Sequence, residues 1–241
     1  MALQEQTLTY HCDELELQAT LVYDDQWGQP RPAVLICPDA MGGKTAFETG
    51  RAQALAELGY VGIALDVYGA GVRAKDGEGA YALMGPLLED REQLRKRLAA
   101  GLAMAREQHS VDGARIAAMG YCFGGCCVLE MARAGFDVRA VASFHGNLSA
   151  DSRVPTHTIG AKVLAMHGWS DPLVPEQQVN EFAAEMTASG ADWQLIAYGH
   201  ALHSFTNPQA NAPKMGIGYD AKTEQRSWLA LQQLLNEAFA G

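Results

Sequence analysis

The chain has 241 residues, a length that suits one large α/β domain over residues 1–241 or two small domains. With 48% hydrophobic and 19% charged residues, its composition is that of an ordinary globular protein. Acidic residues outnumber basic ones by 28 to 18, giving a formal net charge of -10. A negative field of this kind argues against nucleic acids and anionic membrane surfaces as partners.

Apolar patterning predicts the strands. Residues 7–12 and 15–23 mostly alternate between apolar and polar around the pair Asp13-Glu14, which indicates an antiparallel N-terminal hairpin. Continuous or near-continuous apolar runs, typical of strands buried on both faces, follow at residues 33–37, 60–65, 115–119, 138–144, 162–166 and 193–198.

Helical spacing of apolar residues predicts helices between these strands. We expect them at residues 46–58, from Leu87 to about His109, from Gly124 or Gly125 onward, from Pro175 to Gly190, and around Trp228, Leu231 and Leu235. The buried side of the first would hold Phe47, Ala54, Leu55 and Leu58. Residues 68–79, rich in glycine and charge, predict a loop.

Strands that alternate with helices of ten or more residues indicate βαβ units. We therefore predict a doubly wound α/β fold with a mostly parallel sheet and an antiparallel N-terminal hairpin. In such sheets, functional sites form where strands end at their carboxyl edge.

Cys122 is the candidate nucleophile. The run Met-Gly-Tyr-Cys-Phe-Gly-Gly at residues 119–125 lies between a predicted strand and a predicted helix, and it matches the Gly-x-Ser-x-Gly turn with cysteine in place of serine. The helix N terminus favours a thiolate, and the backbone N–H of Phe123 is placed to stabilise an oxyanion. A buried core cysteine beside a glycine-rich turn is the alternative. The combination of strand, motif and helix favours the functional interpretation.

A cysteine nucleophile needs a base, and the base needs a group that orients it. Asp171 follows the strand at 162–166 and is the candidate acid, although Asp-Pro is also an ordinary turn signal. His200 and His203 both follow the strand at 193–198, and spacing alone does not choose between them.

Two further histidines follow predicted strands. His167 fits a structural hydrogen bond, whereas His145 fits either a pocket wall or a packed interior position. No Cys-x-x-Cys or His-x-x-x-His spacing indicates a metal site.

The compartment follows from the N terminus and the cysteines. Residues 1–7 have neither the basic nor the apolar region of a signal peptide, and no apolar run approaches the roughly 20 residues of a membrane span. Five cysteines, an odd number, fit a reducing environment. We expect a cytoplasmic protein.

The motifs together resemble the dienelactone hydrolase family over nearly the whole chain. They are Gly-Tyr-Cys-Phe-Gly-Gly, Trp-Ser-Asp-Pro-Leu-Val-Pro, His-Ser-Phe, Cys-Pro-Asp-Ala-Met-Gly-Gly and the C-terminal Gly-Tyr-Asp-Ala and Arg-Ser-Trp segments. The resemblance implies an α/β-hydrolase fold without a cofactor. It also implies Cys122 as nucleophile, Asp171 as orienting acid and His203 as base, and the His-Ser-Phe match favours His203 over His200.

Two positions depart from the pattern of the family's lactone hydrolases. A glutamate near the thiol is replaced by Asp39, whose neighbour Ala40 would supply the second oxyanion N–H. An arginine that holds the substrate carboxylate is replaced by Asn207, so we expect uncharged substrates. Tyr68, His145 and Trp169 are candidates for the pocket wall.

The resemblance implies a carboxylic ester hydrolase that cleaves a small-molecule ester or lactone through a thioester acyl-enzyme. A thioesterase or acyltransferase with the same triad, or a non-catalytic small-molecule-binding protein on this fold, is the alternative.

Overall fold

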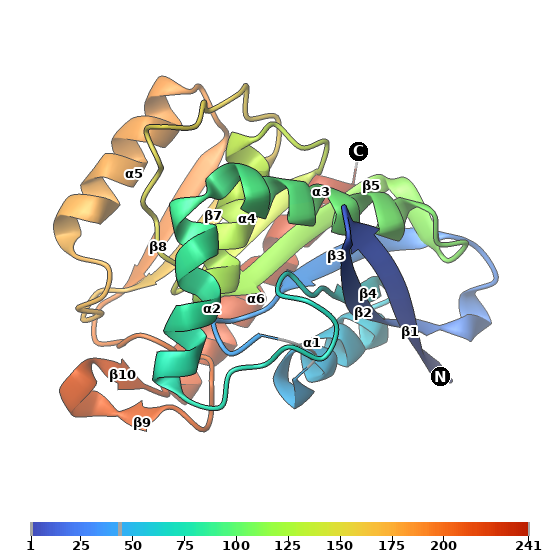
Figure 1. Cartoon of the computed structure of the whole chain (residues 1–241), viewed down its shortest axis with the longest axis horizontal. Helices are drawn as coiled ribbons and strands as arrows, with labels where there is room; N and C mark the ends of the chain where they lie inside the picture. Colours follow the sequence, from blue (N-terminus) through green and yellow to red (C-terminus); the bar gives the residue numbers. More distant parts are fainter. Residues whose placement is uncertain (1, 43–44, 241) are drawn as a thin grey trace. The chain divides into compact units, whose positions relative to one another are not determined.

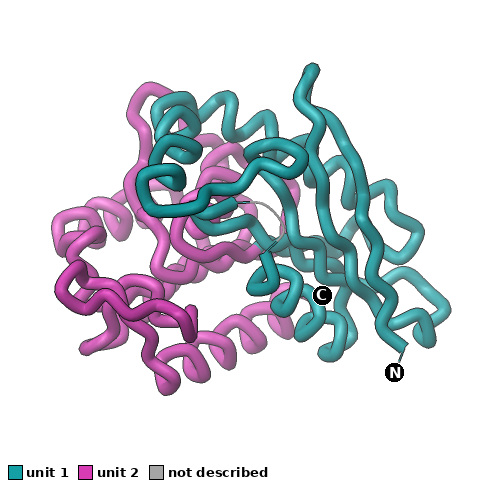
Figure 2. Tube along the Cα trace, turned by 60° about the horizontal axis from the view of Figure 1, so that its bottom comes forward, with its two compact units in different colours: residues 1–118 teal, residues 119–241 magenta. Residues whose placement is uncertain are grey.

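The computed structural model describes residues 2–42 and 45–240, so Gly43 of the Met-Gly-Gly motif lies outside the described residues. Contacts within the chain divide it into two compact units, Met1–Ala118 and Met119–Gly241 (Figure 2). Among the described residues, no helix has the length and apolar character needed to cross a membrane.

The first unit opens with the predicted hairpin, which is confirmed. β1 (Leu3–Cys12) and β2 (Leu15–Asp24) pair antiparallel over their whole length, so Asp13 and Glu14 form the connection. Asp13 has φ 53°, the left-handed conformation that two-residue connections of this kind require. The 3₁₀ turn η1 (Asp25–Trp27) follows.

Two parallel strands come next in the first unit. β3 (Arg31–Cys37) pairs parallel with β4 (Val61–Ala64), and β4 pairs antiparallel with β2 (Figure 1). All four residues of β4 and six consecutive residues of β3 are buried, which shows that both faces of these strands are covered. Both predicted strands are confirmed.

Helix α1 (Ala46–Glu57) is confirmed between these strands, and its predicted buried face is right for Leu55 but wrong for Leu58. The buried residues are Glu48, Ala52, Leu55 and Ala56. Leu58, predicted to be buried, is 43% exposed. The helix approaches β4 so closely that a Cβ on Gly62 would lie 2.4 Å from the carbonyl oxygen of Ala52. The close approach explains why alanines, Ala52 and Ala56, lie on the buried face of the helix.

The single long helix predicted from Leu87 onward is in fact two helices. α2 (Gly77–Glu89) starts inside the predicted loop and contains Pro86 near its end, and α3 (Arg91–Arg106) follows. Asp90 separates them and caps α3 through its side chain. The leucine spacing continues across this break, which is why apolar periodicity alone does not reveal it.

The second unit contains the remaining strands and helices. Its elements are α4 (Phe123–Arg133), β6 (Ala140–Phe144), β7 (Lys162–Gly168), α5 (Glu176–Ala188), β8 (Trp193–Tyr198) and α6 (Ala221–Phe239). β6 pairs parallel with β7, and β7 pairs parallel with β8. All six elements are predicted from the sequence, and α4 starts at Phe123, slightly before the predicted Gly124 or Gly125.

A small substructure between β8 and α6 is not predicted. β9 (Asn211–Ala212) and β10 (Ile217–Gly218) form an antiparallel pair around the 3₁₀ turn η2 (Pro213–Met215). Two-residue strands are too short to show an apolar period.

The fold class is confirmed. The strands are hydrogen-bonded in the order β1-β2-β4-β3-β5-β6-β7-β8, where β5 (Val111–Tyr121) has residues in both units. The β3–β4, β6–β7 and β7–β8 pairs are parallel, and the antiparallel hairpin joins at one end of the order. This is an α/β fold with a mostly parallel sheet.

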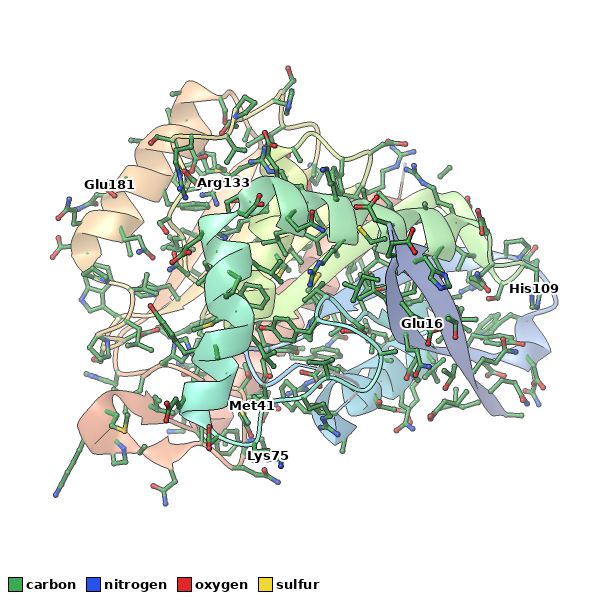
Figure 3. All side chains as sticks on the ribbon, in the orientation of Figure 1. Glu16, Met41, Lys75, His109, Arg133 and Glu181 are labelled. Carbon is green, nitrogen blue, oxygen red and sulfur yellow. The ribbon has the colours of Figure 1, made fainter. Side chains whose placement is uncertain are left out.

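A buried ionic network fixes the far end of α4 in the second unit. The side chain of Arg133 (labelled in Figure 3) is 1% exposed and bonds to Glu130 and Glu185. The same guanidinium donates to the carbonyl oxygens of Leu148 and Ser149, at 2.7 and 3.2 Å. Arg133 therefore connects α4 to α5 and to the segment that follows β6.

We predict that Arg133→Met lowers the free energy of unfolding by about 3–5 kcal/mol, because it leaves the buried Glu130 carboxylate without its cation. Urea denaturation followed by circular dichroism measures the change. Arg153→Met is the matched control, since Arg153 pairs with Asp151 but is 69% exposed, and exposed pairs contribute about 0–1 kcal/mol. Equal losses in the two variants would contradict the importance of the buried network.

Candidate active site

The strand–turn–helix segment places Cys122 between the end of β5 and the start of α4. Cys122 has φ 54° and ψ -114°, a conformation that costs a non-glycine residue of order 1–3 kcal/mol. The turn is so tight that a Cβ on Gly120 would lie 2.1 Å from the carbonyl oxygen of Gly124. The thiol is consequently held at the N terminus of α4, where it is partly exposed, whereas the other four cysteines are buried.

Cys122, His203 and Asp171 are joined by hydrogen bonds within the second unit. His203 Nε2 lies 3.2 Å from Cys122 Sγ, and His203 Nδ1 lies 2.8 Å from Asp171 Oδ2. Asp171 Oδ1 accepts the backbone N–H of Leu173 at 2.8 Å, so both oxygens of this buried carboxylate have partners. A thiol, an imidazole and a carboxylate connected in this order can perform nucleophilic catalysis.

The unpredicted β9–β10 substructure fixes the backbone of His203. The N–H of His203 donates to the carbonyl oxygen of Gly216 at 2.8 Å, and its carbonyl oxygen accepts from Gly218 at 2.9 Å. Gly216 in turn packs on Pro172, beside the acid, because a Cβ at Gly216 would lie 2.2 Å from the proline ring. Gly216, which holds the backbone of His203, therefore contacts Pro172, which follows Asp171.

The environment of His203 stabilises its protonated form. Burial disfavours the imidazolium, but the hydrogen bonds to Asp171 and Cys122, together with electrostatic attraction to both groups, raise the pKa of His203 to about 10. The imidazole therefore carries its second proton at neutral pH.

The structure distinguishes the competing histidines. His203, not His200, reaches Cys122 and Asp171, and His200 lies exposed in the loop. His167 is buried, but its Nδ1 has no hydrogen-bond partner, so this atom does not make the structural bond expected of it.

His145 does not form an exposed pocket wall. Its side chain is 3% exposed; its Nδ1 accepts the backbone N–H of Cys122 at 3.2 Å, and its Nε2 lies 2.8 Å from Thr206 Oγ1. Of the two positions that the sequence leaves open for His145, its burial fits the packed interior one. Thr206 is a site residue that the sequence analysis misses, because nothing in its local pattern indicates a partner 61 residues away.

The other candidates in the second unit occupy varied positions. Phe123 is the buried first residue of α4. Trp169 is 48% exposed and, with Asp171, borders a small hollow of about 120 Å³. Asn207 is half-buried, and its side-chain oxygen accepts the N–H of Gln209 at 2.9 Å, which closes its own turn.

Asp39, Ala40 and Tyr68 belong to the first unit and lie together there. Asp39 accepts the N–H of Met41 at 2.8 Å, and burial raises its pKa. The hydroxyl of Tyr68 lies 3.4 Å from the carbonyl oxygen of Ala40. The neighbouring Glu48, which the sequence analysis does not single out, is fully buried, and burial followed by repulsion from Asp39 raises its pKa to about 7. The roles of these residues toward substrate stay predictions.

A mostly parallel α/β sheet whose strand ends carry a strained Gly-x-Cys-x-Gly turn, a histidine and an aspartate is the arrangement of an α/β-hydrolase. Within residues 2–42 and 45–240, no group of three or more His, Cys, Asp or Glu side chains is placed to hold a metal ion.

Comparison with known proteins gives the family. The model of the dienelactone hydrolase family matches residues 17–239. The solved structure of the dienelactone hydrolase-like promiscuous phosphotriesterase P91, from metagenomic libraries, is 32% identical, with a TM-score of 0.92 over 99% of each chain. A structure named m3DLH is 36% identical, with a TM-score of 0.94 over 99% of this chain and 100% of its own.

A curated relative matches part of the chain. The uncharacterized protein K02A2.1 of Caenorhabditis elegans is 40% identical over 151 residues, which span 61% of this chain and 96% of that protein. The chain belongs to the dienelactone hydrolase family and is a hydrolase.

We predict that Asp171→Asn lowers the pKa of His203 by about one unit or more, because the variant removes the carboxylate charge that favours the imidazolium. Histidine-selective NMR across pH 5–11 measures the change, with Asp151→Asn as a control that removes an acid elsewhere in the same unit. A His203 titration that is the same in the two variants would contradict the electrostatic coupling.

Proposed function

We propose that this protein hydrolyses carboxylic esters or lactones through a thioester formed on Cys122. The observation that carries the proposal is the single imidazole of His203, which lies within hydrogen-bond distance of both the Cys122 thiol and the Asp171 carboxylate. The family match covers residues 17–239, so we assign the function to residues 1–241 acting as one α/β-hydrolase domain.

In the first half-reaction, the thiolate of Cys122 attacks the carbonyl carbon and forms a C–S bond. The resulting oxyanion accepts hydrogen bonds, and we propose the backbone N–H of Phe123 at the N terminus of α4 as one donor. When the oxyanion collapses, the bond to the alcohol oxygen breaks, and His203 Nε2 gives its proton to that oxygen. An alcohol leaves, or the ring opens in a lactone, and the acyl group remains as a thioester.

In the second half-reaction, His203 acts as general base. Its neutral Nε2 takes a proton from water while the water oxygen attacks the thioester carbonyl. The C–S bond then breaks, the carboxylic acid leaves, and the Cys122–His203 pair is restored. Asp171 keeps its charge throughout and stabilises the imidazolium each time that it forms.

A phosphotriester is a second candidate substrate. P91, which is 32% identical over 99% of both chains, is by its name a promiscuous phosphotriesterase. The same sulfur can attack a tetrahedral phosphorus centre in place of a planar carbonyl. A panel of p-nitrophenyl esters, thioesters, lactones and a p-nitrophenyl phosphotriester separates these classes, and it includes the thioesterase alternative.

We predict that Cys122→Ala lowers kcat for ester hydrolysis by about 10⁴-fold or more while the fold survives. Quenching the native enzyme during turnover and mass mapping its peptides should locate the acyl group on Cys122. Cys12→Ala, at the last residue of β1, is the cysteine control. Full activity in Cys122→Ala, or an acyl adduct on another residue, would refute the proposal.

The choice of base is tested in the same assay. His203→Gln should approach the loss seen for Cys122→Ala, whereas His200→Gln should keep most of the activity because His200 is exposed in its loop. A larger loss at His200 would refute the assignment of the base.

We predict a preference for uncharged esters and lactones over substrates with a carboxylate beside the scissile group. Asn207 carries no charge and can offer a carboxylate only a hydrogen bond from a neutral amide, whereas an arginine at this position could form a bidentate ion pair. Asn207→Arg should therefore raise kcat/KM for a carboxylated lactone relative to its methyl ester by roughly tenfold.

The control for this prediction is Gln209→Arg, which adds the same charge at an exposed residue of the same turn. A native enzyme that already favours the anion tenfold would show that another cation holds the carboxylate. An equal gain in both arginine variants would mean that general electrostatic attraction, and not position 207, sets the preference.

A further inference from the structure

The proposed mechanism gives no role to His145, a buried titratable side chain at the site. His145 follows β6, is 3% exposed, and touches the nucleophile through its backbone and not its sulfur. The N–H of Cys122 is shared between His145 Nδ1, at 3.2 Å, and the carbonyl oxygen of Phe144, at 3.0 Å.

The hydrogen bonds define the tautomer of His145. An N–H faces Nδ1, so Nδ1 must carry a lone pair, and the proton of the neutral ring then lies on Nε2. Nε2 donates this proton to Thr206 Oγ1 at 2.8 Å. The Thr206 hydroxyl is buried and can accept this proton, so its position is compatible with the tautomer that presents an acceptor to Cys122.

The site concentrates backbone strain at the same residues. Among the described non-glycine residues, four have positive φ, and three of them are Cys122, His145 and Ser204, with φ of 54°, 41° and 60°. Strained residues persist only where their surroundings hold them. The bond from Cys122 to His145 connects two of these residues directly.

The turn that presents His145 is itself fixed by close packing. Gly146 lies so near α4 that a Cβ at Gly146 would sit 2.8 Å from the Cα of Gly125 and 2.4 Å from Ser143 Oγ. The backbone of this turn therefore cannot move toward α4, and the imidazole of His145 stays beside the backbone N–H of Cys122.

His145 also lies beside the proposed base without competing for its proton. The two rings meet edge to face, with centroids 5.1 Å apart, and His145 packs on Phe205 in the same manner at 5.0 Å. Burial, and then the nearby charge of His203, lower the pKa of His145 well below its usual value. A neutral ring is the form that both hydrogen bonds require.

We propose that His145 is a positioning residue, which holds the backbone N–H of Cys122 through Nδ1 and thereby keeps the strained turn in its reactive conformation, with Thr206 selecting its tautomer. This inference rests on the proposed function of Cys122. It assigns His145 no contact with the substrate.

Substitution of His145 by asparagine or by glutamine separates the roles of its two ring nitrogens. Asparagine can place an acceptor near the position of Nδ1, and it tolerates the left-handed backbone of residue 145. Glutamine reaches the position of Nε2 and can bond Thr206, but it presents no acceptor to Cys122. His145→Asn should keep kcat within about threefold of the native value, whereas His145→Gln should lower kcat by tenfold or more, because small displacements of reacting atoms cost up to about 10²-fold.

Thr206 gives a second matched pair. Thr206→Ser keeps the hydroxyl and should keep kcat, whereas Thr206→Val removes the acceptor of the Nε2 proton and should lower kcat by about tenfold, because an unpaired buried donor favours the wrong tautomer. KM should stay within about twofold in all four variants. Histidine ¹⁵N NMR should show His145 as a neutral ring with its proton on Nε2, and Thr206→Val should change that pattern.

The results for these variants distinguish failure of the positioning role of His145 from failure of the proposed function. If Cys122→Ala is active, the proposed function fails. If Cys122→Ala is inactive but His145→Gln matches His145→Asn in kcat, or His145 carries its proton on Nδ1, the positioning role is overturned. Circular dichroism melting of each variant identifies losses due to unfolding, and an equal loss of kcat in folded Asn and Gln variants also overturns the proposal.

Discussion

The backbone conformation of Cys122 is the constraint on which the site depends. At φ 54° and ψ -114°, the residue costs free energy that the strand before it and the helix after it must supply. The glycine at position 120 removes the collision with Gly124 that any side chain would cause. The same turn places the sulfur at the N terminus of α4, which is the positive end of the helix dipole.

All three side chains of the linked Cys–His–Asp group lie within Met119–Gly241. Their spacing is therefore set by packing inside this unit. α4 is held at its N-terminal end by the turn of Cys122 and at its C-terminal end by the buried Arg133 network. The ring centroids of His145 and His203 are 5.1 Å apart, yet their pKa values shift in opposite directions. Burial lowers the pKa of His145, whereas the bonds to Asp171 and Cys122 outweigh burial and raise the pKa of His203.

Much of this arrangement is predictable from the sequence, because parallel strands bring the residues that follow them to one edge. Cys122 and Asp171 are found in this way. The choice of His203 over His200 does not follow from strand order and is predicted only through the His-Ser-Phe resemblance. The structural support of His203 includes its bridge to Ile217, in an element too short to leave a sequence pattern. The bond between His145 and Thr206 also escapes prediction, because it joins side chains 61 residues apart that no periodicity relates. The break between α2 and α3 also escapes prediction, because the helical spacing of leucines continues across Asp90.

The β9–β10 substructure has a consequence for how substrate range can diversify in such an enzyme. His203 is tied to Gly216 and Gly218, and Tyr219 is tied to Ala210, so the chain is closed on both sides of the tip at residues 211–215. The cost of lengthening a closed loop grows only with the logarithm of its length, by about 0.6 kcal/mol for each doubling. Insertions at this tip, where Met215 is 68% exposed, would leave the anchors of the imidazole in place. Variation of the tip is thus a route by which natural drift or a combinatorial library can change the surface of the β9–β10 substructure without moving the backbone that holds His203.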